Sequence, residues 1–299
     1  PEINYIHTTG NDSLSCIYVA DPAYAQANWQ INIDSWTSLC QGTILQNYTY
    51  VPDDNFEQAL IDLGYDDVLD DYVVTDSINS VTDLDVSNDS ISDLTGIEGF
   101  TALTELHCSD NQLTTLDVSN NAALTNLRCN NNQLDSLDVS NNTSLTSLWC
   151  QHNELTSLDV SSNTALTDLI CFYNSMDTLN LGTTTALTTL DCAHNELTTL
   201  DVSNHTALTV LRCYDNELAA LDVSFNTALT ELQCFANQLD TLDISNNTSL
   251  TYLECRNNQL TSLDVSNNTV LTDLYTHNNP LSSLDVSNNT ALTLSLIHI

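Results

Sequence analysis

Lysine is absent from this sequence of 299 residues, and its three cations are Arg128, Arg212 and Arg256. Against them stand 40 aspartates and glutamates, which give a formal net charge of −37 at pH 7. Nucleic acids and anionic membranes are bound by basic surfaces that release counterions, so this charge argues against either as a partner. It also predicts solubility at high ionic strength, because salt screens repulsion beyond about 10 Å.

Glycine and long apolar runs are scarce as well. The six glycines are too few for a phosphate-binding loop. No apolar run reaches about 18 residues, so we expect no membrane insertion. The sequence begins at Pro1 without a basic and apolar leader, and any export signal is expected to lie upstream or to have been removed.

A repeat with a period of 21 residues dominates what is present. Nine consecutive copies span residues 103–291 and begin at Leu103, Leu124, Leu145, Leu166, Leu187, Leu208, Leu229, Leu250 and Leu271. A fixed period of this size marks a solenoid, in which each copy is one turn that buries its apolar side only against its neighbours.

The repeat pattern Leu-x-x-Leu-x-Cys-x-x-Asn-x-Leu-x-x-Leu resembles the leucine-rich repeat family. Within that family it is similar to the bacterial 21-residue subclass of secreted and surface proteins of the Bacteroidetes type, which are internalin-like. The resemblance implies a solenoid with a parallel β-sheet on its concave face, a convex side that is mostly irregular or made of short strands, and a small helical N-terminal cap.

Two columns of identical residues are expected to hold the turns together. Alternation along each strand places Leu106 and Cys108 inward. The cysteine column is interpreted as a small buried hydrophobe rather than a metal or redox ladder, since no CxxC spacing occurs. Asn111 and its equivalents are predicted to bond the backbone of the turn and the adjacent Asn. The cysteines are Cys108, Cys129, Cys150, Cys171, Cys192, Cys213, Cys234 and Cys255, with Thr276 in the ninth position.

The segments around the array differ from it. Residues 1–50 resemble the tail of a preceding leucine-rich module, and Cys16 and Cys40 there form either a disulfide or two unpaired thiols. Residues 51–80 are predicted to contain a helical cap over 52–64, with Asp54 and Glu57 as a capping box and Gly64 at its end. Residues 81–102 form a first repeat of 22 residues. Residues 292–299 break the pattern and are interpreted as a truncated or artefactual end, or as a short capping strand.

A column of aspartates marks the second half of the copies, from Asp117 to Asp285, with Asn180 as its exception. Neighbours about 5 Å apart repel unless salt, hydrogen bonds from Ser and Thr, or Ca²⁺ relieve them. We favour hydrogen bonds and retain Ca²⁺ as the alternative cofactor. Ser136, Thr178 and Thr241 follow an aspartate and resemble O-glycosylation acceptors of Bacteroidetes-type secreted proteins.

The informative residues vary from copy to copy and point outward from the strands. All three arginines and every aromatic residue of the nine copies except Phe225 fall in four outward columns. Aromatic residues and arginine are typical of recognition surfaces. The predicted ligand-binding residues on the concave face are Arg128, Trp149, His152, Ile170, Phe172, Tyr173, Asp191, His194, Arg212, Tyr214, Phe235, Tyr252, Arg256 and Tyr275.

These features predict a secreted or cell-surface recognition module that binds a protein or a glycan. The alternative is a structural segment of a tandem adhesin stalk or of a self-associating extracellular fibre. No nucleophile, acid–base pair or metal-ligand spacing indicates an enzyme, since His152 and His194 lie two turns apart and Asp191 with Arg212 suggests an ion pair.

Overall fold

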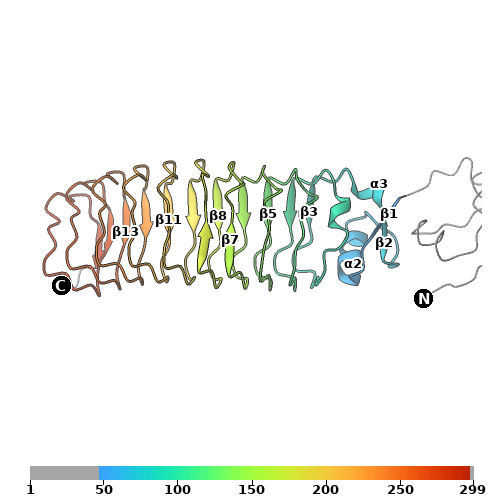
Figure 1. Ribbon diagram of the computed structural model, residues 1–299, viewed down its shortest axis with the longest axis horizontal. Helices are drawn as coiled ribbons and strands as arrows, with labels where there is room; N and C mark the ends of the chain where they lie inside the picture. The colour runs from blue at the N-terminus through green and yellow to red at the C-terminus, as the bar shows by residue number, and fades with distance from the viewer. Residues whose placement is uncertain (1–46, 297–299) are drawn as a thin grey trace, which may run out of the picture.

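The computed structural model describes residues 47–296 as a solenoid of stacked turns with a small helical cap at its N-terminal end (Figure 1). Eleven three-residue strands form one sheet along the stack and make its concave face. In order along the sheet they are β3 (Asp83–Asp85), β4 (Glu105–His107), β5 (Asn126–Arg128), β6 (Ser147–Trp149), β8 (Asp168–Ile170), β10 (Thr189–Asp191), β11 (Val210–Arg212), β12 (Glu231–Gln233), β13 (Tyr252–Glu254), β14 (Asp273–Tyr275) and β15 (Leu294–Leu296).

The strands pair in parallel and in register. Leu127 lies opposite Leu148, and Leu148 lies opposite Leu169, so residues one copy apart are neighbours. The step from β3 to β4 takes one residue more, since Leu84 lies opposite Leu106. The predicted leucine-rich repeat solenoid is therefore confirmed, and equivalent residues form columns.

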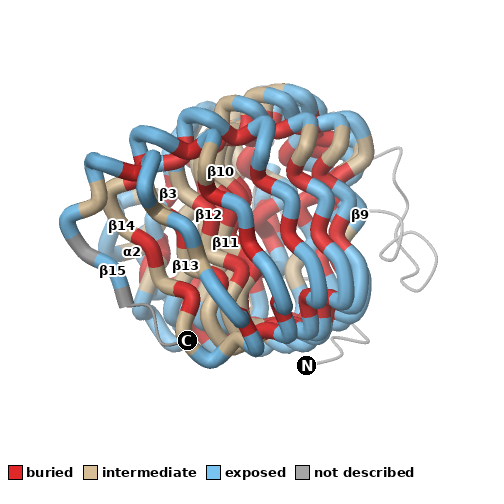
Figure 2. Tube along the Cα trace, turned by 90° about the vertical axis from the view of Figure 1, so that its left-hand side faces the viewer, coloured by how far each residue is buried: buried red, intermediate tan, exposed pale blue. Residues whose placement is uncertain are grey.

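The opposite side of the turns is mostly irregular. Only β7 (Ser157–Asp159) and β9 (Thr178–Asn180) form a further pair of strands there among residues 47–296. Buried residues form a continuous inner band beneath both sides, while the outer bends are exposed (Figure 2). Length along the stack, rather than a single central core, gives this fold its stability.

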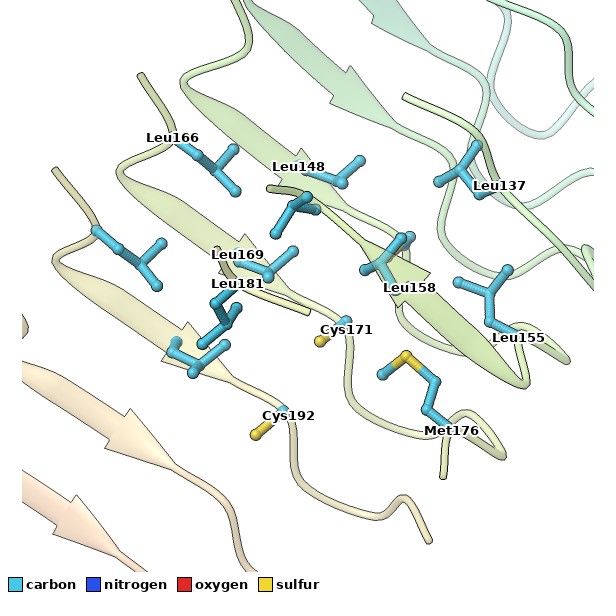
Figure 3. Close-up of a cluster of buried hydrophobic side chains, with 14 of the residues drawn as sticks. Leu137, Leu148, Leu155, Leu158, Leu166, Leu169, Cys171, Met176, Leu181 and Cys192 are labelled. Atoms are coloured by element: carbon cyan, nitrogen blue, oxygen red, sulfur yellow. The ribbon is translucent and has the colours of Figure 1, made fainter. Parts of the chain in front are cut away.

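Leucine side chains from successive turns fill the interior (Figure 3). Leu148 and Leu169 are fully buried, as are Leu155 and Met176, which occupy the same position in consecutive copies. Each buried leucine stabilises the fold by roughly 1.5–3 kcal/mol relative to an exposed one. Every turn contributes several such residues, so the interior tolerates wide variation in the outward columns.

The cysteine column lies in this interior, as predicted. All eight cysteines of the array are buried and have free thiols. Burial raises the pKa of each thiol, for example that of Cys129 to about 12, so the column acts as a set of small apolar side chains. Thr276 takes the ninth position, where its hydroxyl is buried without a hydrogen-bond partner.

The predicted asparagine ladder is present, but its bonds run to the backbone. Nδ2 of Asn132 donates to the carbonyl oxygens of Cys108 at 3.0 Å and Cys129 at 3.1 Å. Oδ1 of Asn132 accepts the backbone N–H of Leu113 at 3.0 Å. Each amide thus ties two turns together, and the expected bond to the adjacent Asn side chain was wrong.

A second asparagine ladder, which the sequence interpretation missed, runs along the other side. Nδ2 of Asn142 donates to Val118 O and Asn121 O, each at 3.0 Å. Thr184 and His205 interrupt this column at consecutive turns. They bond each other at 2.9 Å through His205 Nε2 and Thr184 Oγ1, and burial lowers the pKa of His205. The remaining members are Asn163, Asn226, Asn247, Asn268 and Asn289.

The N-terminal cap contains β1 (Tyr48–Tyr50) antiparallel to β2 (Tyr72–Val74), α2 (Asp54–Asp62) and α3 (Thr75–Ile78). The N-cap of α2 is Asp53, whose Oδ1 accepts from the backbone of Asn55 and Phe56, so the capping box at Asp54 and Glu57 was wrong. Glu57 is buried instead, because its carboxylate accepts N–H groups of the loop before β2.

Contacts between α2 and the first turn close the end of the array. The rings of Phe56 and Phe100 lie 6.4 Å apart, and Oδ2 of Asp53 accepts the backbone N–H of Ser92 at 2.9 Å. Gly64 has a φ of 81° just after the helix, as a helix-ending glycine requires. Cys16 and Cys40 lie outside the described residues, and the domain boundaries stay predictions.

Candidate functional site

The four outward columns lie side by side on the concave face. The first two columns come from the first and third residues of each three-residue strand of this face. The other two come from the two residues that follow the inward cysteine after the strand. Trp149, Ile170 and Asp191 are register neighbours in the second column. Phe172 and Tyr173 come after β8 and the inward Cys171, and they supply the third and fourth columns. The sequence pattern therefore placed these side chains on one face.

The fourth column has a left-handed backbone in every regular copy. Most copies place Asn or Asp there, which tolerate this conformation. Three consecutive turns place rings there instead: His152 with a φ of 55°, Tyr173 with 51° and His194 with 49°. A left-handed conformation costs a bulky residue such as Tyr173 of order 1 kcal/mol, so its ring occupies the position against local preference. Histidine, like Asn and Asp, is enriched in this conformation.

Those three rings form the centre of a stack that we name the aromatic ladder, made of His152, Phe172, Tyr173, His194, Tyr214 and Phe235. Tyr173 lies between two imidazoles, with ring centroids 4.7 Å from His152 and 4.0 Å from His194. Tyr214 stacks on Phe235 at 4.3 Å, and His194 meets Tyr214 edge-on at 5.1 Å. Phe172 meets His152 and Tyr173 edge-on, which completes the ladder.

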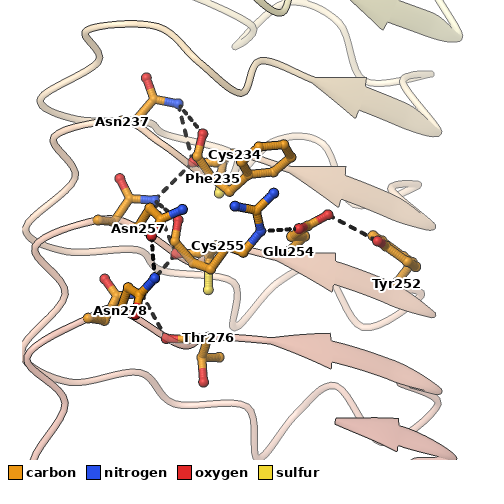
Figure 4. Close-up of polar contacts among 12 residues, drawn as sticks. Cys234, Phe235, Asn237, Tyr252, Glu254, Cys255, Asn257, Thr276 and Asn278 are labelled. Atoms are coloured by element: carbon orange, nitrogen blue, oxygen red, sulfur yellow. Dashed lines mark hydrogen bonds and ion pairs between the residues drawn. The ribbon is translucent and has the colours of Figure 1, made fainter. Parts of the chain in front are cut away.

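Arginines cover ring faces near both ends of this region. Cζ of Arg128 lies 4.4 Å from the ring centroid of Trp149, and Cζ of Arg256 lies 3.9 Å from that of Phe235. Nε of Arg256 also donates to Glu254, which accepts the hydroxyl of Tyr252 at 3.0 Å (Figure 4). The predicted residue Tyr275 lies beside Tyr252, with ring centroids 5.7 Å apart.

The third arginine lies in an ion-pair network at the middle of the face. Nε of Arg212 donates to Glu231 at 2.8 Å, and its Nη1 lies 3.7 Å from Oδ2 of Asp191. Burial raises the pKa of Asp191, although Arg212 and a backbone N–H oppose that shift. His194 is paired with Asp215 at 3.0 Å. Arg212 and Arg256 thus pair with acids of this chain, while Arg128 contacts the ring of Trp149.

Several polar atoms near Trp149 are buried without a hydrogen-bond partner. They are Nε2 of His107, Oδ1 of Asn126, Nε of Arg128 and Oε1 of Gln151. Buried polar groups in folded proteins are nearly always bonded, so such a cluster calls for an explanation. His107, Asn126 and Arg128 lie on β4 and β5, and Gln151 follows β6.

The aspartate column lies on the other side of the turns and has a structural role. Oδ1 of Asp243 accepts the backbone N–H of Ser245 at 2.9 Å, and the hydroxyl and N–H of that serine lower the pKa of the carboxyl. The same bond recurs from Asp117 to Asp285. Within residues 47–296 no three His, Cys, Asp or Glu side chains converge as metal ligands would. Ca²⁺ binding by the aspartate column stays a prediction.

The suggested O-glycosylation residues lie on this outer side too. The hydroxyls of Ser136 and Thr178 donate to the preceding aspartates at 2.8 Å and 2.7 Å, and Thr241 makes the same contact at 3.2 Å. All three are exposed. Ser136 also lines a shallow hollow of about 430 Å³ with Asp117 and Asp138, away from the aromatic ladder. Glycosylation of these residues stays a prediction.

Comparison with known proteins gives a partial family match and several similar structures. The LVIVD repeat family model matches residues 192–216 and 233–256, which are short segments of the array. The solved functional domain of internalin J from Listeria monocytogenes, described as including a cysteine ladder, is 42% identical with a TM-score of 0.79. That similarity covers 84% of this chain and 56% of that domain.

Other relatives agree on the architecture. Curated internalin J of Listeria monocytogenes serotype 4b (strain F2365) is 42% identical over 85 residues, which are 28% of this chain and 9% of that protein. A leucine-rich repeat protein of Leptospira interrogans is 25% identical with a TM-score of 0.63, covering 68% of this chain and 56% of that one. The chain thus spans about half of the solved domain and a small part of the curated relative.

No helix among residues 47–296 has the length and apolar character needed to cross a bilayer.

Proposed function

Given that this chain is a leucine-rich repeat protein similar to the bacterial internalins, we propose that it is a recognition or adhesion module whose partner binds the aromatic ladder on the concave face. A secreted or cell-surface location forms part of the proposal. The similarity to internalin J supports an interaction module in general terms. The choice of surface rests on this chain's own geometry.

The observation that carries the proposal is Tyr173, which is held in left-handed backbone between the stacked rings of His152 and His194. Residues held against their conformational preference concentrate at functional sites. Tyr173 is also 47% exposed despite its two stacked neighbours. Tyrosine is enriched among the residues that dominate binding energy, so an exposed, pre-ordered tyrosine suits an anchor.

The unbonded polar atoms beside Trp149 support the same surface. A bound partner can supply hydrogen bonds to Arg128 Nε and Gln151 Oε1 after small side-chain rotations. Binding rather than catalysis is proposed because Asp191, Glu231 and Glu254 are engaged by arginines of the face.

Substitution of two rings of the ladder together with Trp149, which lies on the same face, tests the proposal. Replacing Trp149, Phe172 and Tyr214 with Ser is expected to abolish adhesion of beads coated with the full chain to host or neighbouring bacterial cells. The matched control is Phe225→Ser, because Phe225 is 57% exposed and lies outside the four outward columns. Equal adhesion by both variants, with circular dichroism showing both folded, would contradict a ligand site on the ladder.

The same experiment addresses the stalk or fibre alternative. In that case the three substitutions leave adhesion unchanged, and electron microscopy of the purified chain shows end-to-end fibres. Discrete particles together with ladder-dependent adhesion favour the recognition module.

A further inference from the structure

The orientation of the ladder rings restricts the chemistry of the partner. Tyr173 is stacked on both sides by imidazoles, at interplanar angles of 18° and 7°. Tyr214 and Phe235 stack at 10°, and Arg256 covers the remaining face of Phe235. The stacked faces are therefore occupied by groups of this chain, and edges and hydroxyls are left for a ligand.

Occupied ring faces disfavour a neutral glycan. Sugars bind aromatic side chains by laying an apolar face against the ring, and that position is already filled at Tyr173 and Phe235. Ring edges instead suit apolar side chains and the aliphatic stems of long polar ones. The ladder thus favours a protein surface.

The charges of the concave face favour a positively charged partner. Its outward columns hold eight carboxylates and three guanidinium groups, and those guanidinium groups contact acids or rings of this chain. The carboxylates are Glu105, Asp110, Asp168, Asp191, Asp215, Glu231, Glu254 and Asp273. The carboxylates of Asp168 and Asp273 each accept a hydrogen bond from the hydroxyl of the preceding threonine, at 2.6 Å and 2.7 Å. Neither carboxylate pairs with an arginine among the ion pairs of residues 47–296.

The turns that carry His194, Tyr214 and Phe235 lie between those of Asp168 and Asp273, and Phe172 and Tyr173 share the turn of Asp168. The two aspartates occupy the first column on β8 and β14, five strands apart, and thus about 24 Å apart at roughly 4.8 Å per strand. Interfaces that bury about 800 Å² per partner readily span that length. Lysine or arginine side chains of a partner could therefore pair with Asp168 and Asp273, whose carboxylates have no arginine partner in the described part of this chain.

We propose that the partner is a protein with a basic docking surface, whose lysine or arginine side chains meet Asp168 and Asp273 while their stems and apolar neighbours pack on the edges of the aromatic ladder. This inference rests on the proposed function, because it names the chemistry of the ligand for that same face. Binding of a neutral glycan or an anionic polymer as the primary ligand would contradict it.

Selection from a phage-displayed library of random dodecapeptides tests the proposal, with the full chain as bait. Enriched peptides are expected to carry net positive charge with apolar residues between the cations. Their dissociation constants are expected to rise about tenfold in Tyr173→Asn and in the double variant Asp168→Asn with Asp273→Asn. Asp243→Asn with Asp264→Asn removes equal charge from the outer side and is expected to leave affinity within about twofold.

Each other result overturns the inference. Enrichment of neutral or acidic peptides, or of none, contradicts a basic partner. Basic peptides that lose equal affinity in the inner and outer aspartate variants indicate general attraction to a polyanion. A parallel screen of neutral and sulfated oligosaccharides separates the two proposals: Tyr173-dependent sugar binding refutes the basic partner and leaves the recognition face standing. If neither peptides nor sugars depend on Tyr173, both proposals fail.

Discussion

The imidazole of His194 and the phenol ring of Tyr173 lie parallel, with centroids 4.0 Å apart, although both residues have left-handed backbone dihedrals of 49° and 51°. Local conformational preference and stacking therefore oppose each other at Tyr173. Replacing Tyr173 with Asn can thus separate a role in stability from a role in binding. Asparagine lacks the ring but tolerates the left-handed backbone.

Replacing Tyr173 with Asn is expected to weaken ligand binding with at most a modest loss of stability. Two stacked contacts are lost, at about 0.5–1.5 kcal/mol each, but the strain of order 1 kcal/mol is relieved. We expect the free energy of unfolding in urea to fall by about 0–2 kcal/mol. A loss of more than about 2 kcal/mol would mean that the ladder mainly stabilises the fold.

Restoring the interrupted cysteine column should stabilise the array. Thr276 buries a hydroxyl without a partner where the other copies place a thiol. Thr276→Cys is expected to raise the free energy of unfolding by about 1 kcal/mol, measured by urea titration. The reverse change, Cys255→Thr, serves as the control and should destabilise; a gain in stability from it would contradict the argument.

The buried pair of His205 and Thr184 predicts a pH dependence. Burial lowers the folded-state pKa of His205 below its ordinary value of 6.5. The unfolded chain then binds the proton first, so the stabilisation is complete above about pH 6.5 and is lost as the pH falls toward the lowered folded pKa. Urea unfolding at about pH 7.5 and pH 5 is expected to show this loss.

A double variant that completes the second asparagine ladder tests whether His205 causes this pH dependence. Thr184→Asn with His205→Asn supplies the amide found at that position in the other regular copies. The double variant should lose less stability than the wild type between the two pH values, and should be more stable at both. An identical pH dependence in the two proteins would show that other groups, not His205, cause it.

The outer aspartates predict a dependence on salt and acid. Bonds from serine hydroxyls and N–H groups lower the pKa of Asp222, Asp243 and Asp264 below the ordinary 3.8. A lowered pKa stabilises the fold above that ordinary value, and the stabilisation is lost as the pH falls through the lowered one. Neighbouring carboxylates still repel along the column at neutral pH.

Replacing all three with Asn keeps an acceptor oxygen but removes the negative charge. The triple variant is expected to have a lower Tm than the wild type at about pH 7, because the lowered pKa values mean that the bonds to each charged carboxylate outweigh the repulsion between neighbours. The loss should persist at about 1 M NaCl, where salt screens the repulsion, and differential scanning calorimetry at both salt concentrations measures it. A Tm above that of the wild type at low salt would show that the repulsion dominates.

The sequence was sufficient to predict the solenoid because its period is strict. With Leu127, Leu148 and Leu169 one copy apart, strand register follows, and the outward columns follow from alternation. Once the columns were assigned, the spacing between neighbouring strands was enough to predict which side chains of the concave face contact each other. This is why Asp191 and Arg212 could be paired in advance, and why the ring residues were placed together.

The details that were missed depend on backbone conformation and on single polar atoms. Periodicity does not reveal that Tyr173 sits in left-handed backbone, because Asn and Asp at equivalent positions only hint at it. The N-cap of α2 is Asp53 rather than Asp54. Both are aspartates, so the sequence alone does not show which of them caps the helix. The second asparagine ladder had a sequence signal: its column holds Asn in every regular copy except those of Thr184 and His205.

The strict register also sets how such a surface can change over generations. Loss of residues 187–207 by recombination between neighbouring copies would remove one whole coil and leave every inward column intact. Tyr214 would then become the neighbour of Phe172, and His194 would vanish from the middle of the stack. A gene of this design can therefore lengthen, shorten or reshuffle its recognition stripe in steps of one strand spacing, without inventing a new interior.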